Sequence, residues 1–584
     1  MHSAWRRMHE NPANKIGDTM SEESRDSKQQ DLRVGVFICD CGSNIAGHLD
    51  CGAVTEYAAS LPGVAFAKEN LYTCSESGVL EIKNAIKEHD LNRVVVASCS
   101  PRTHQPLFAS SCAEAGLNPY LFEMVNIRDQ CSWVHMQETD KATEKAKELV
   151  RMAVAKSALL EPQQDIESSL DRRAVVIGGG VAGMSAAETM AGMGMEVVLV
   201  EKEARLGGLL RFLNQLGPER IQAAERVEEL VRSVQEKENI TLHLESEVTN
   251  LGGYIGNYQL TIQPASGQAI QETAGCIVVA TGAVPWTPPS GEYGYGQDRV
   301  ITQMELEQRL ADESFIPPDR VVILQCAGAR CEERPYCSRI CCLTGVKNAL
   351  LLKEMSPETE VHILYRDMQM YGTDKESMLW EARGKGIAFH VYDPDQGLQV
   401  QSDRIAFHDS LRGEDREIPF DLAVLSTPLV ARDNARKISQ MMRVPTDQND
   451  FFLEAHAKLR PLDFAADGIF VCGSARYPAT VEEARSQGMG TAARIGTILF
   501  KEKLISSAIV AEIDPESCVG CLGCIQVCPY QAITYDPQQG VCRVNEILCK
   551  GCGNCASACP SHSIQLRGYK PDQLFSQIRA LAEA

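Results

Sequence analysis

The residues with the clearest chemistry in this sequence are cysteines that recur at short, regular intervals toward its end. Two runs have the form Cys-x2-Cys-x2-Cys-x3-Cys-Pro. Thiolates at this spacing hold 4Fe-4S clusters, and where two such runs occur together the fourth cysteine of each ligates the other cluster. The runs predict one cluster on Cys518, Cys521, Cys524 and Cys559, and a second on Cys549, Cys552, Cys555 and Cys528. Four thiolates also hold zinc, but two interleaved runs that both end in Cys-Pro favour clusters.

A further group of cysteines follows a predicted strand near the middle of the chain. The strand at 321–325 runs directly into Cys326, and more cysteines follow within 17 residues. Thiolates suit iron-sulfur clusters, so a third cluster is predicted on Cys326, Cys337, Cys341 and Cys342. Cys331 is the spare or substitute ligand. The alternative is a set of buried or redox-sensing thiols.

Cysteines also lie at or near the ends of predicted strands in the first part of the chain. They occur in the segments ICDCG, LYTCS, VASCS and RDQCS. Parallel sheets bring the carboxyl ends of their strands to one edge, which would let these thiols converge. A cluster in this region would draw its ligands from Cys39, Cys41, Cys74, Cys99 and Cys131. The alternative is that these cysteines are small, buried apolar residues.

A glycine-rich turn indicates a dinucleotide site. The strand AVVIG leads into Gly178-Gly179-Gly180-Val181-Ala182-Gly183, a helix follows, and the next strand ends at Glu201. In such turns the first glycine makes the bend, the second lets the backbone approach a pyrophosphate, and the third packs helix on strand. The helix N-terminus binds phosphate. The carboxylate of Glu201 would accept hydrogen bonds from the ribose hydroxyls.

Three later segments resemble those of flavoproteins with two dinucleotide-binding lobes, such as thioredoxin reductase. They are EKEARLGG, CIVVATG and DGIFVCG. The resemblance implies FAD, bound by Gly178, Gly180, Val181, Ala182, Gly183, Glu201, Lys202, Gly207, Gly208, Ala280, Thr281, Gly282 and Gly473. Those flavoproteins usually have Asp after the last glycine, where this chain has Ser474.

The same resemblance would place a nicotinamide-binding turn in the second lobe, and this chain lacks it. No Gly-x-Gly-x-x-Gly follows the strand at 321–325, where Cys326 stands instead. A dinucleotide and a thiolate-bound cluster are both anionic and repel at close range. We therefore expect that NAD(P)H does not reduce the flavin directly.

Length and composition restrict the classes of protein and partner. A chain of 584 residues suits three or four domains. A net charge of -21 argues against nucleic acid or anionic lipid as partners. No long apolar run occurs, which predicts a cytoplasmic protein without a membrane span. The 23 cysteines, many at metal-ligand spacing, favour clusters over disulfides.

The alternation of strand and helix patterns predicts the domain organisation. The fold class is α/β, with a thioredoxin-reductase-like FAD domain of two dinucleotide-type lobes, an N-terminal parallel α/β domain and a C-terminal ferredoxin-like α+β domain. The expected boundaries are a disordered tail at 1–30, the cluster-bearing α/β domain at 31–165, the FAD domain at 166–504 with a second lobe at about 318–455, the two-cluster domain at 505–568 and a helix at 569–584.

Most of the chain after Asp31 resembles the A subunits of heterodisulfide reductases. The resemblance is carried by VFICDCGSNIAGHLD, NLYTCSESG, VVVASCSPRTHQPLF, NPYLFEMVNIRDQCSWVH, the Gly178 turn, YCSRICC, LYRDMQMYG and the paired cysteine runs. It implies an oxidoreductase of anaerobic metabolism: an FAD and 4Fe-4S electron-transfer subunit of a cytosolic, oligomeric complex that bifurcates or confurcates electrons. It also supports the N-terminal cluster.

The resemblance further implies the partners. They are B- and C-like heterodisulfide reductase subunits, a hydrogenase or dehydrogenase module, and ferredoxin. Some family members carry an additional ferredoxin-like insertion after the first flavin segment, whereas residues 209–275 here contain no cysteine.

Two other functions remain open at this point. One is a self-contained NAD(P)H-dependent iron-sulfur flavoenzyme of the glutamate synthase small-subunit type, which has the second glycine-rich turn that this chain lacks. The other is a cluster-bearing redox sensor, which would not turn over with partner proteins.

Overall fold

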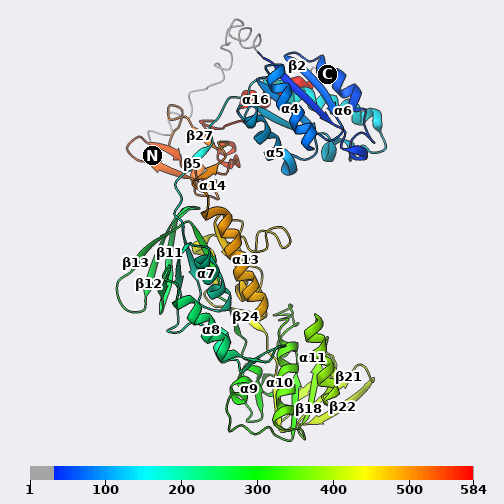
Figure 1. The fold of residues 1–584 in the computed structure, drawn as a ribbon, viewed down its shortest axis with the longest axis vertical. Helices are drawn as coiled ribbons and strands as arrows, with labels where there is room; N and C mark the ends of the chain where they lie inside the picture. The colour runs from blue at the N-terminus through cyan, green and yellow to red at the C-terminus, as the bar shows by residue number, and fades with distance from the viewer. Residues whose placement is uncertain (1–31, 583–584) are drawn as a thin grey trace. The chain divides into compact units, whose positions relative to one another are not determined.

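The computed structural model describes residues 32–582, which form two compact units (Figure 1). One unit combines residues 32–166 with 505–582, and the other comprises residues 167–504. The tail predicted at 1–30 lies outside the described residues. The second unit is therefore an insertion between the two segments of the first.

The first unit begins with a parallel four-stranded sheet of order β2-β1-β3-β4. Its strands are β1 (Val34–Cys39), β2 (Val64–Asn70), β3 (Arg93–Ser98) and β4 (Phe122–Asn126). Helices α3 (Cys51–Ala59) and α6 (Thr139–Ser157) cover one face, and α4 (Glu76–Glu88) and α5 (Pro101–Glu114) cover the other. Alternate residues of β1 and β3 enter the two cores, as expected for a sheet buried on both faces. The predicted parallel α/β domain is confirmed.

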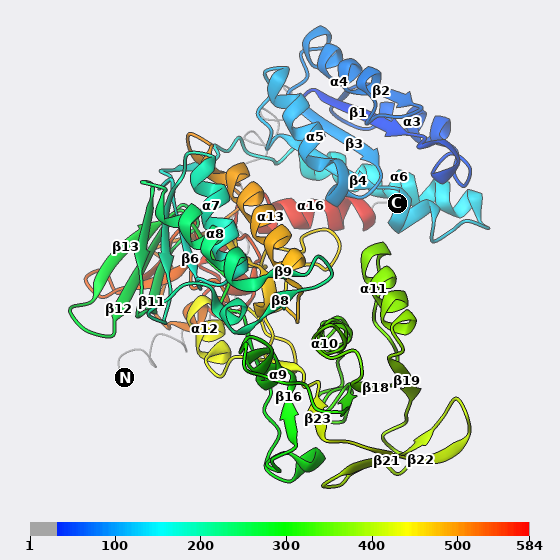
Figure 2. The ribbon, with the colours of Figure 1, turned by 60° about the horizontal axis from the view of Figure 1, so that its bottom comes forward.

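The second unit contains two lobes, and the first is built on a parallel sheet of order β10-β7-β6-β14-β25. The strands are β6 (Arg173–Ile177), β7 (Glu196–Val200), β10 (Ile240–His243), β14 (Cys276–Val279) and β25 (Ile469–Val471). Figure 2 shows α7 (Val181–Gly192), α8 (Ala223–Gln235) and α13 (Val481–Leu499) together on one side of this sheet. An antiparallel sheet covers the other face, with strands β11 (Ser246–Tyr254), β12 (Asn257–Pro264) and β13 (Ile270–Ala274).

The second lobe repeats this architecture. Its parallel sheet has the order β16-β23-β17-β18-β19. The strands are β16 (Val300–Thr302), β17 (Arg320–Leu324), β18 (Glu360–Tyr365), β19 (Ala388–Val391) and β23 (Leu422–Leu425). Helices α9 (Gln303–Leu310), α10 (Cys341–Met355) and α11 (Thr373–Gly384) cover one face, and the antiparallel strands β21 (Arg404–Asp409) and β22 (Glu414–Pro419) cover the other.

The limits of the second lobe differ from the expected 318–455 at both ends. Its sheet already begins at β16, a strand of three residues that is too short to show a pattern in the sequence. Helix α12 (Ala435–Met442), expected in the second lobe, packs its apolar side on the first lobe through Ala435, Ile438 and Met442. Strands β15 (Ala283–Pro285) and β24 (Leu429–Ala431) pair where the chain passes between the lobes.

The C-terminal part of the first unit is a small duplicated α+β domain. Strand β27 (Ala511–Ile513) pairs with β30 (Ile564–Leu566), and β28 (Ile533–Asp536) pairs with β29 (Val541–Val544). Each cysteine run contributes one short helix, α14 (Gly523–Val527) or α15 (Asn554–Ser557). Cysteines make up much of the small buried core, which fits a domain organised around clusters.

The last described helix, α16 (Pro571–Ala582), packs on α6 within the first unit. Gln573 Nε2 donates to the carbonyl of Leu159 at 2.9 Å, and Lys570 pairs with Glu161 at 2.6 Å. The ammonium of Lys156 lies 4.2 Å from the ring centre of Tyr569. Segments from the two ends of the described chain therefore complete one domain.

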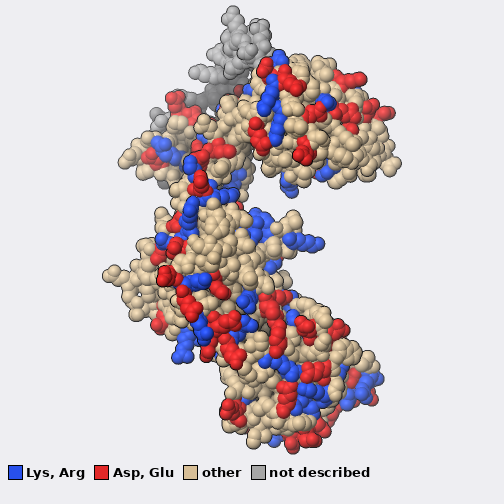
Figure 3. Space-filling model, viewed as in Figure 1, with Lys and Arg blue, Asp and Glu red and all other residues tan. Residues whose placement is uncertain are grey.

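Acidic and basic side chains are both present on the surface that Figure 3 shows. On the face shown in Figure 3, they are interspersed rather than gathered into one basic surface. The full sequence has a net charge of -21, with 78 acidic and 57 basic residues. None of the helices among residues 32–582 combines the length and apolar character needed to cross a membrane.

Candidate functional site

A cavity of about 290 Å³ lies between the two lobes of the second unit. It opens at the carboxyl ends of β6, β7 and β14, where parallel sheets of this kind bind ligands. Predicted FAD residues that line it are Gly178, Gly180, Val181, Ala182, Glu201, Lys202, Gly207, Gly208, Ala280, Thr281 and Gly282. The structure therefore brings residues from four separate segments of the sequence to one cavity.

The three glycines of the turn meet different constraints. A Cβ on Gly178, whose φ is +112°, would lie 2.3 Å from the Ala280 carbonyl oxygen, and one on Gly183 would lie 1.8 Å from that of Gly178. A Cβ on Gly180 would meet no atom within 4 Å. The fold thus requires the first and third glycines, whereas Gly180 leaves space on the cavity wall. That space fits a pyrophosphate beside the start of α7.

Glu201 follows β7 directly and is 9 % exposed. Its carboxylate accepts hydrogen bonds from the backbone N–H groups of Gly179 at 2.6 Å and Glu203 at 2.8 Å. These bonds hold the side chain at the edge of the cavity, where a carboxylate accepts bonds from ribose hydroxyls.

Two predicted FAD residues do not line the cavity. Gly183 packs α7 against the turn, as described above. Gly473, with φ of +68°, places its Cα beside Ala182 and donates its N–H to Gln487 Oε1 at 2.9 Å. Ser474, which replaces the usual Asp, does line the cavity and accepts a hydrogen bond from Ala479 N at 3.3 Å.

The second-lobe cysteines converge beside this cavity. Cys326 follows β17, and Cys341 and Cys342 are the first residues of α10. Burial, followed by the neighbouring thiols of Cys342, Cys326 and Cys337, raises the pKa of Cys341. Burial also raises the pKa of Cys342 to about 11, with further contributions from Cys326 and Cys337. Cys341 lines the cavity itself, so this group of thiols adjoins the predicted flavin position.

Cys331 lies in the same loop and has a different environment. It is partly exposed, and its Sγ donates to the Gly328 carbonyl oxygen at 3.6 Å. Among residues 32–582, no three His, Cys, Asp or Glu side chains are close enough to hold a single metal ion. The ligand geometry for a 4Fe-4S cluster differs from that for a single ion, because each iron of the cluster binds its own cysteine sulfur.

A buried ion pair that sequence reasoning missed also borders the cavity. Lys347 Nζ of α10 lies 2.5 Å from Glu307 Oε1 of α9 and 2.8 Å from the Gln215 carbonyl oxygen. Glu307 is fully buried, and its other oxygen accepts from Asn214 N at 2.9 Å. Burial lowers the pKa of Lys347, and the Glu307 carboxylate opposes that shift. The pair places a charged side chain from each helix on the cavity wall.

Four of the predicted N-terminal cysteines gather at the carboxyl edge of the first sheet. Burial, followed by Cys39 and Cys41, raises the pKa of Cys74. Burial raises the pKa of Cys99, Arg128 lowers it, and Cys41 and Cys74 raise it further. Cys39 ends β1 and Cys99 follows the adjacent strand β3, so thiols that affect one another's pKa values come from one edge of the sheet, where Arg128 also acts on them.

Cys131 does not join the N-terminal group. Its Sγ donates to the Ala142 carbonyl oxygen at 3.1 Å, and its side chain is fully buried in the core between the sheet and α6. No neighbouring thiol affects its pKa, which burial raises to about 11. The sequence RDQC does not show whether Cys131 lies in the core or at the edge of the sheet.

The paired C-terminal runs share their cysteines across the domain. Cys528 of the first run lies with Cys549, Cys552 and Cys555 around one small hollow. This is the crossed arrangement that the two-cluster pattern requires. Near Cys518, Cys521 and Cys524 lies Cys542, a buried thiol from the segment between the two runs. Cys559 belongs to the same buried core as Cys524, and its Sγ contacts Ser563 Oγ at 3.3 Å.

Known protein families match both units. Residues 172–488 match the model of pyridine nucleotide-disulphide oxidoreductases, and residues 511–566 match that of 4Fe-4S dicluster domains. A thioredoxin reductase of T. acidophilum aligns with 56% of this chain and 99% of its own, at 15% identity and a TM-score of 0.39. The two family matches confirm the predicted oxidoreductase, with an FAD or nucleotide domain and 4Fe-4S clusters.

Two curated relatives align over nearly the whole chain. The second iron-sulfur A subunit of the CoB–CoM heterodisulfide reductase of Methanopyrus kandleri is 36% identical over 88% of this chain and 92% of its own length. The A subunit of the H(2):CoB-CoM heterodisulfide,ferredoxin reductase of Methanothermobacter thermautotrophicus is 36% identical over 96% of this chain and 99% of its own length.

Proposed function

Because the chain belongs to the family of heterodisulfide reductase A subunits, we propose that it is the component that splits or merges electron pairs within a multi-subunit complex. The resemblance seen in the sequence is thereby confirmed, and with it an FAD and iron-sulfur electron-transfer subunit. Bifurcation or confurcation is the part that we propose here.

The position of Cys341 is the main support for this proposal. This residue lines the same cavity as the Gly178 turn, although the two come from different lobes. FAD exchanges electrons singly or in pairs, whereas each cluster passes one electron at a time. The cysteine loop would therefore hold its cluster as the electron port of the flavin site.

The protein's own side chains shape this port. With FAD bound, the glycine turn would receive the pyrophosphate and Glu201 the ribose, and Val481 and Ala484 of α13 would form an apolar wall that excludes water. Lys347, held by Glu307, places a positive charge at the cavity wall where negative charge would develop on reduction.

The relatives' names indicate the class of partner. They refer to H(2), a CoB-CoM heterodisulfide and ferredoxin. For this chain we propose B- and C-like subunits, a hydrogenase or dehydrogenase module, ferredoxin as a low-potential carrier, and a cytoplasmic location. The chain would then receive and deliver electrons through other proteins rather than act on a substrate alone.

We predict that NADH and NADPH do not reduce the flavin directly. Strand β17 runs into Cys326 without the glycine-rich turn that a second pyrophosphate would need, and an anionic thiolate-bound cluster there would repel the phosphates. Anaerobic mixing of the cluster-replete protein with excess NADH or NADPH should leave the flavin absorbance unchanged over minutes. Dithionite should bleach it under the same conditions.

Rapid bleaching by either nicotinamide would instead favour the self-contained flavoenzyme. A redox sensor would show a third result, in which the flavin is reduced chemically but no partner fraction reoxidises it. The nicotinamide arms therefore test the self-contained flavoenzyme, and adding a partner fraction to the reduced protein tests the redox sensor.

We also predict three to four 4Fe-4S clusters in each chain. Two belong to the C-terminal runs, one to Cys326, Cys337, Cys341 and Cys342, and one to the N-terminal group. Anaerobic analysis should give about 12 to 16 irons per chain. A value near eight would leave only the C-terminal clusters in place.

A further inference from the structure

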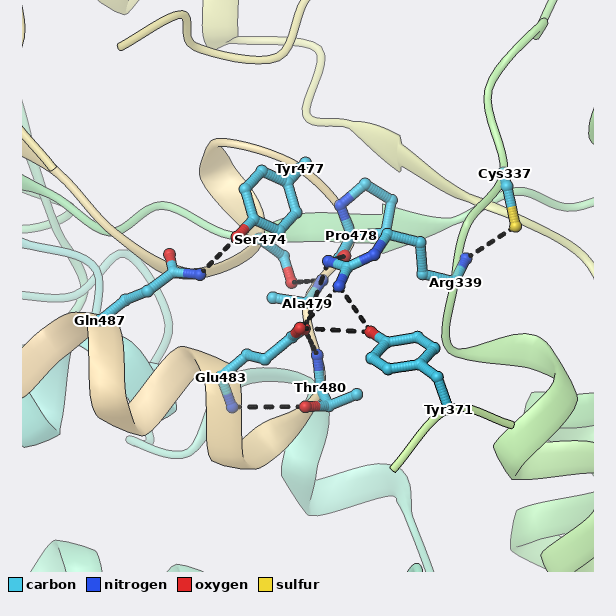
Figure 4. A network of polar contacts seen from close by, with 10 residues as sticks. All are labelled: Cys337, Arg339, Tyr371, Ser474, Tyr477, Pro478, Ala479, Thr480, Glu483 and Gln487. Carbon is cyan, nitrogen blue, oxygen red and sulfur yellow. Dashed lines mark hydrogen bonds and ion pairs between the residues drawn. The ribbon is translucent and has the colours of Figure 1, made fainter. Parts of the chain in front are cut away.

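Arg339 joins the cysteine loop of the second lobe to the flavin-binding lobe through polar contacts. Figure 4 shows Arg339 at the centre of a polar network. Its guanidinium binds both carboxylate oxygens of Glu483, at 2.6 and 3.3 Å, and contacts the Pro478 carbonyl oxygen at 3.4 Å. It also donates to the Tyr371 hydroxyl at 2.5 Å and lies 5.1 Å from the ring centre of Tyr477.

The network is anchored on one side by the start of α13. Thr480 and Glu483 form a capping box, in which each side chain accepts a bond from the other residue's backbone N–H. Thr480 and Val481 also line the flavin cavity. Burial raises the pKa of Glu483, but the Thr480 N–H and the Arg339 guanidinium lower it overall, so the carboxylate stays charged. Because Glu483 is hydrogen-bonded to Thr480, which lines the cavity, a displacement of Glu483 would also move the cavity wall.

On the other side, the network is continuous with the cysteine loop. Arg339 has a left-handed backbone, with φ of +63°, and its N–H donates to Cys337 Sγ at 3.3 Å. Cys341 follows two residues later and lines the cavity. The same residue thus contacts a predicted cluster ligand through its backbone and the flavin-binding lobe through its side chain.

We propose that Arg339 is a positioning residue that fixes the cysteine loop against the flavin cavity. This inference rests on the proposed function, because it assumes a cluster on that loop. Lysine could not replace it, since only a guanidinium offers two parallel donors to one carboxylate together with further donors for Pro478 and Tyr371. The clamp acts on distance and orientation rather than on global stability, because partly exposed ion pairs contribute little to folding.

The test compares Arg339→Gln and Glu483→Gln with the unmodified protein. Gln at 483 keeps the capping box but loses the charge. Amide hydrogen exchange of peptides covering 326–342 should become about tenfold faster in both variants, since the loop opens locally more often. After laser-flash reduction of the clusters, the flavin absorbance should follow about tenfold more slowly, because small misplacements of reacting centres have large kinetic effects.

Arg220→Gln is the matched control. Arg220 also has a left-handed backbone and also joins the lobes, through Glu354 and through Glu381 at 2.7 Å. Glu354 lies near the end of α10, whereas the cysteine loop leads into its start. The control should therefore change neither measurement.

Unchanged exchange and unchanged flavin reduction in Arg339→Gln would overturn the proposal, as would an equal effect of Arg220→Gln. Iron and flavin content, measured on every sample, distinguish failure of the Arg339 proposal from failure of the proposed function. If the unmodified protein lacks the loop cluster, the function fails, whereas the exchange comparison still reports on the clamp.

Discussion

Replacing Gly180 with valine should abolish stoichiometric FAD binding and leave the fold intact. Gly180 has φ of -78°, which valine adopts without strain, and a Cβ there meets no protein atom. The added side chain would instead enter the cavity beside the start of α7, where the pyrophosphate must approach the backbone. The flavin-to-protein ratio after anaerobic purification should fall to near zero, with an unchanged far-UV circular dichroism spectrum.

Two other glycines of α7 provide the controls. Gly192→Val makes the same change at the exposed end of the helix, where a Cβ also meets nothing, and should retain full flavin. Gly183→Ala should instead lower the stability of the fold, since its Cβ would lie 1.8 Å from the Gly178 carbonyl oxygen. Overpacking of this kind costs about 1–3 kcal/mol of folding free energy. A folded Gly180→Val protein with stoichiometric FAD would refute the assignment of the turn.

Replacing Lys347 with methionine should lower the free energy of unfolding of the second unit by about 3–5 kcal/mol. The change keeps most of the side-chain volume but leaves the carboxylate of Glu307, which is fully buried, without its cation. Isothermal urea unfolding, followed by release of the flavin from the second unit, would measure the loss.

Restoring charge balance gives the check on that prediction. The double variant Lys347→Met with Glu307→Gln removes both charges and should recover part of the lost stability. Arg404→Gln removes a surface ion pair with Glu417 in the same lobe and should leave the unfolding midpoint unchanged. A midpoint for Lys347→Met equal to that of Arg404→Gln would show that Glu307 finds another partner or a proton.

Local patterns in the sequence predicted the parts of the site that lie within one strand, turn or helix. The Gly178 turn and the paired cysteine runs are short segments whose spacing follows from one piece of backbone geometry. The crossed sharing of Cys528 was also predictable, since it belongs to the duplicated pattern itself.

Features that depend on packing between distant elements were not predictable. Lys347 and Glu307 are 40 residues apart on different helices, and neither has a local pattern. Cys131 follows a strand as Cys99 does, yet a π-helical turn at Arg128–Ser132 directs it into the core. The limits of the second lobe depend on where the apolar side of α12 finds a matching surface, which no single segment specifies.

The packing of α16 on α6 has a consequence for the order of biosynthesis. Leu159 and Gln573, which share a hydrogen bond there, are 414 residues apart. At about 5–20 residues per second, the ribosome needs roughly 20 to 80 s to make the intervening chain. During that interval α6 lacks its packing against α16, and the inserted unit has time to fold before the first one is finished. Of the two described units, the one whose synthesis begins first is thus completed last, which ties its maturation to synthesis of both cysteine runs.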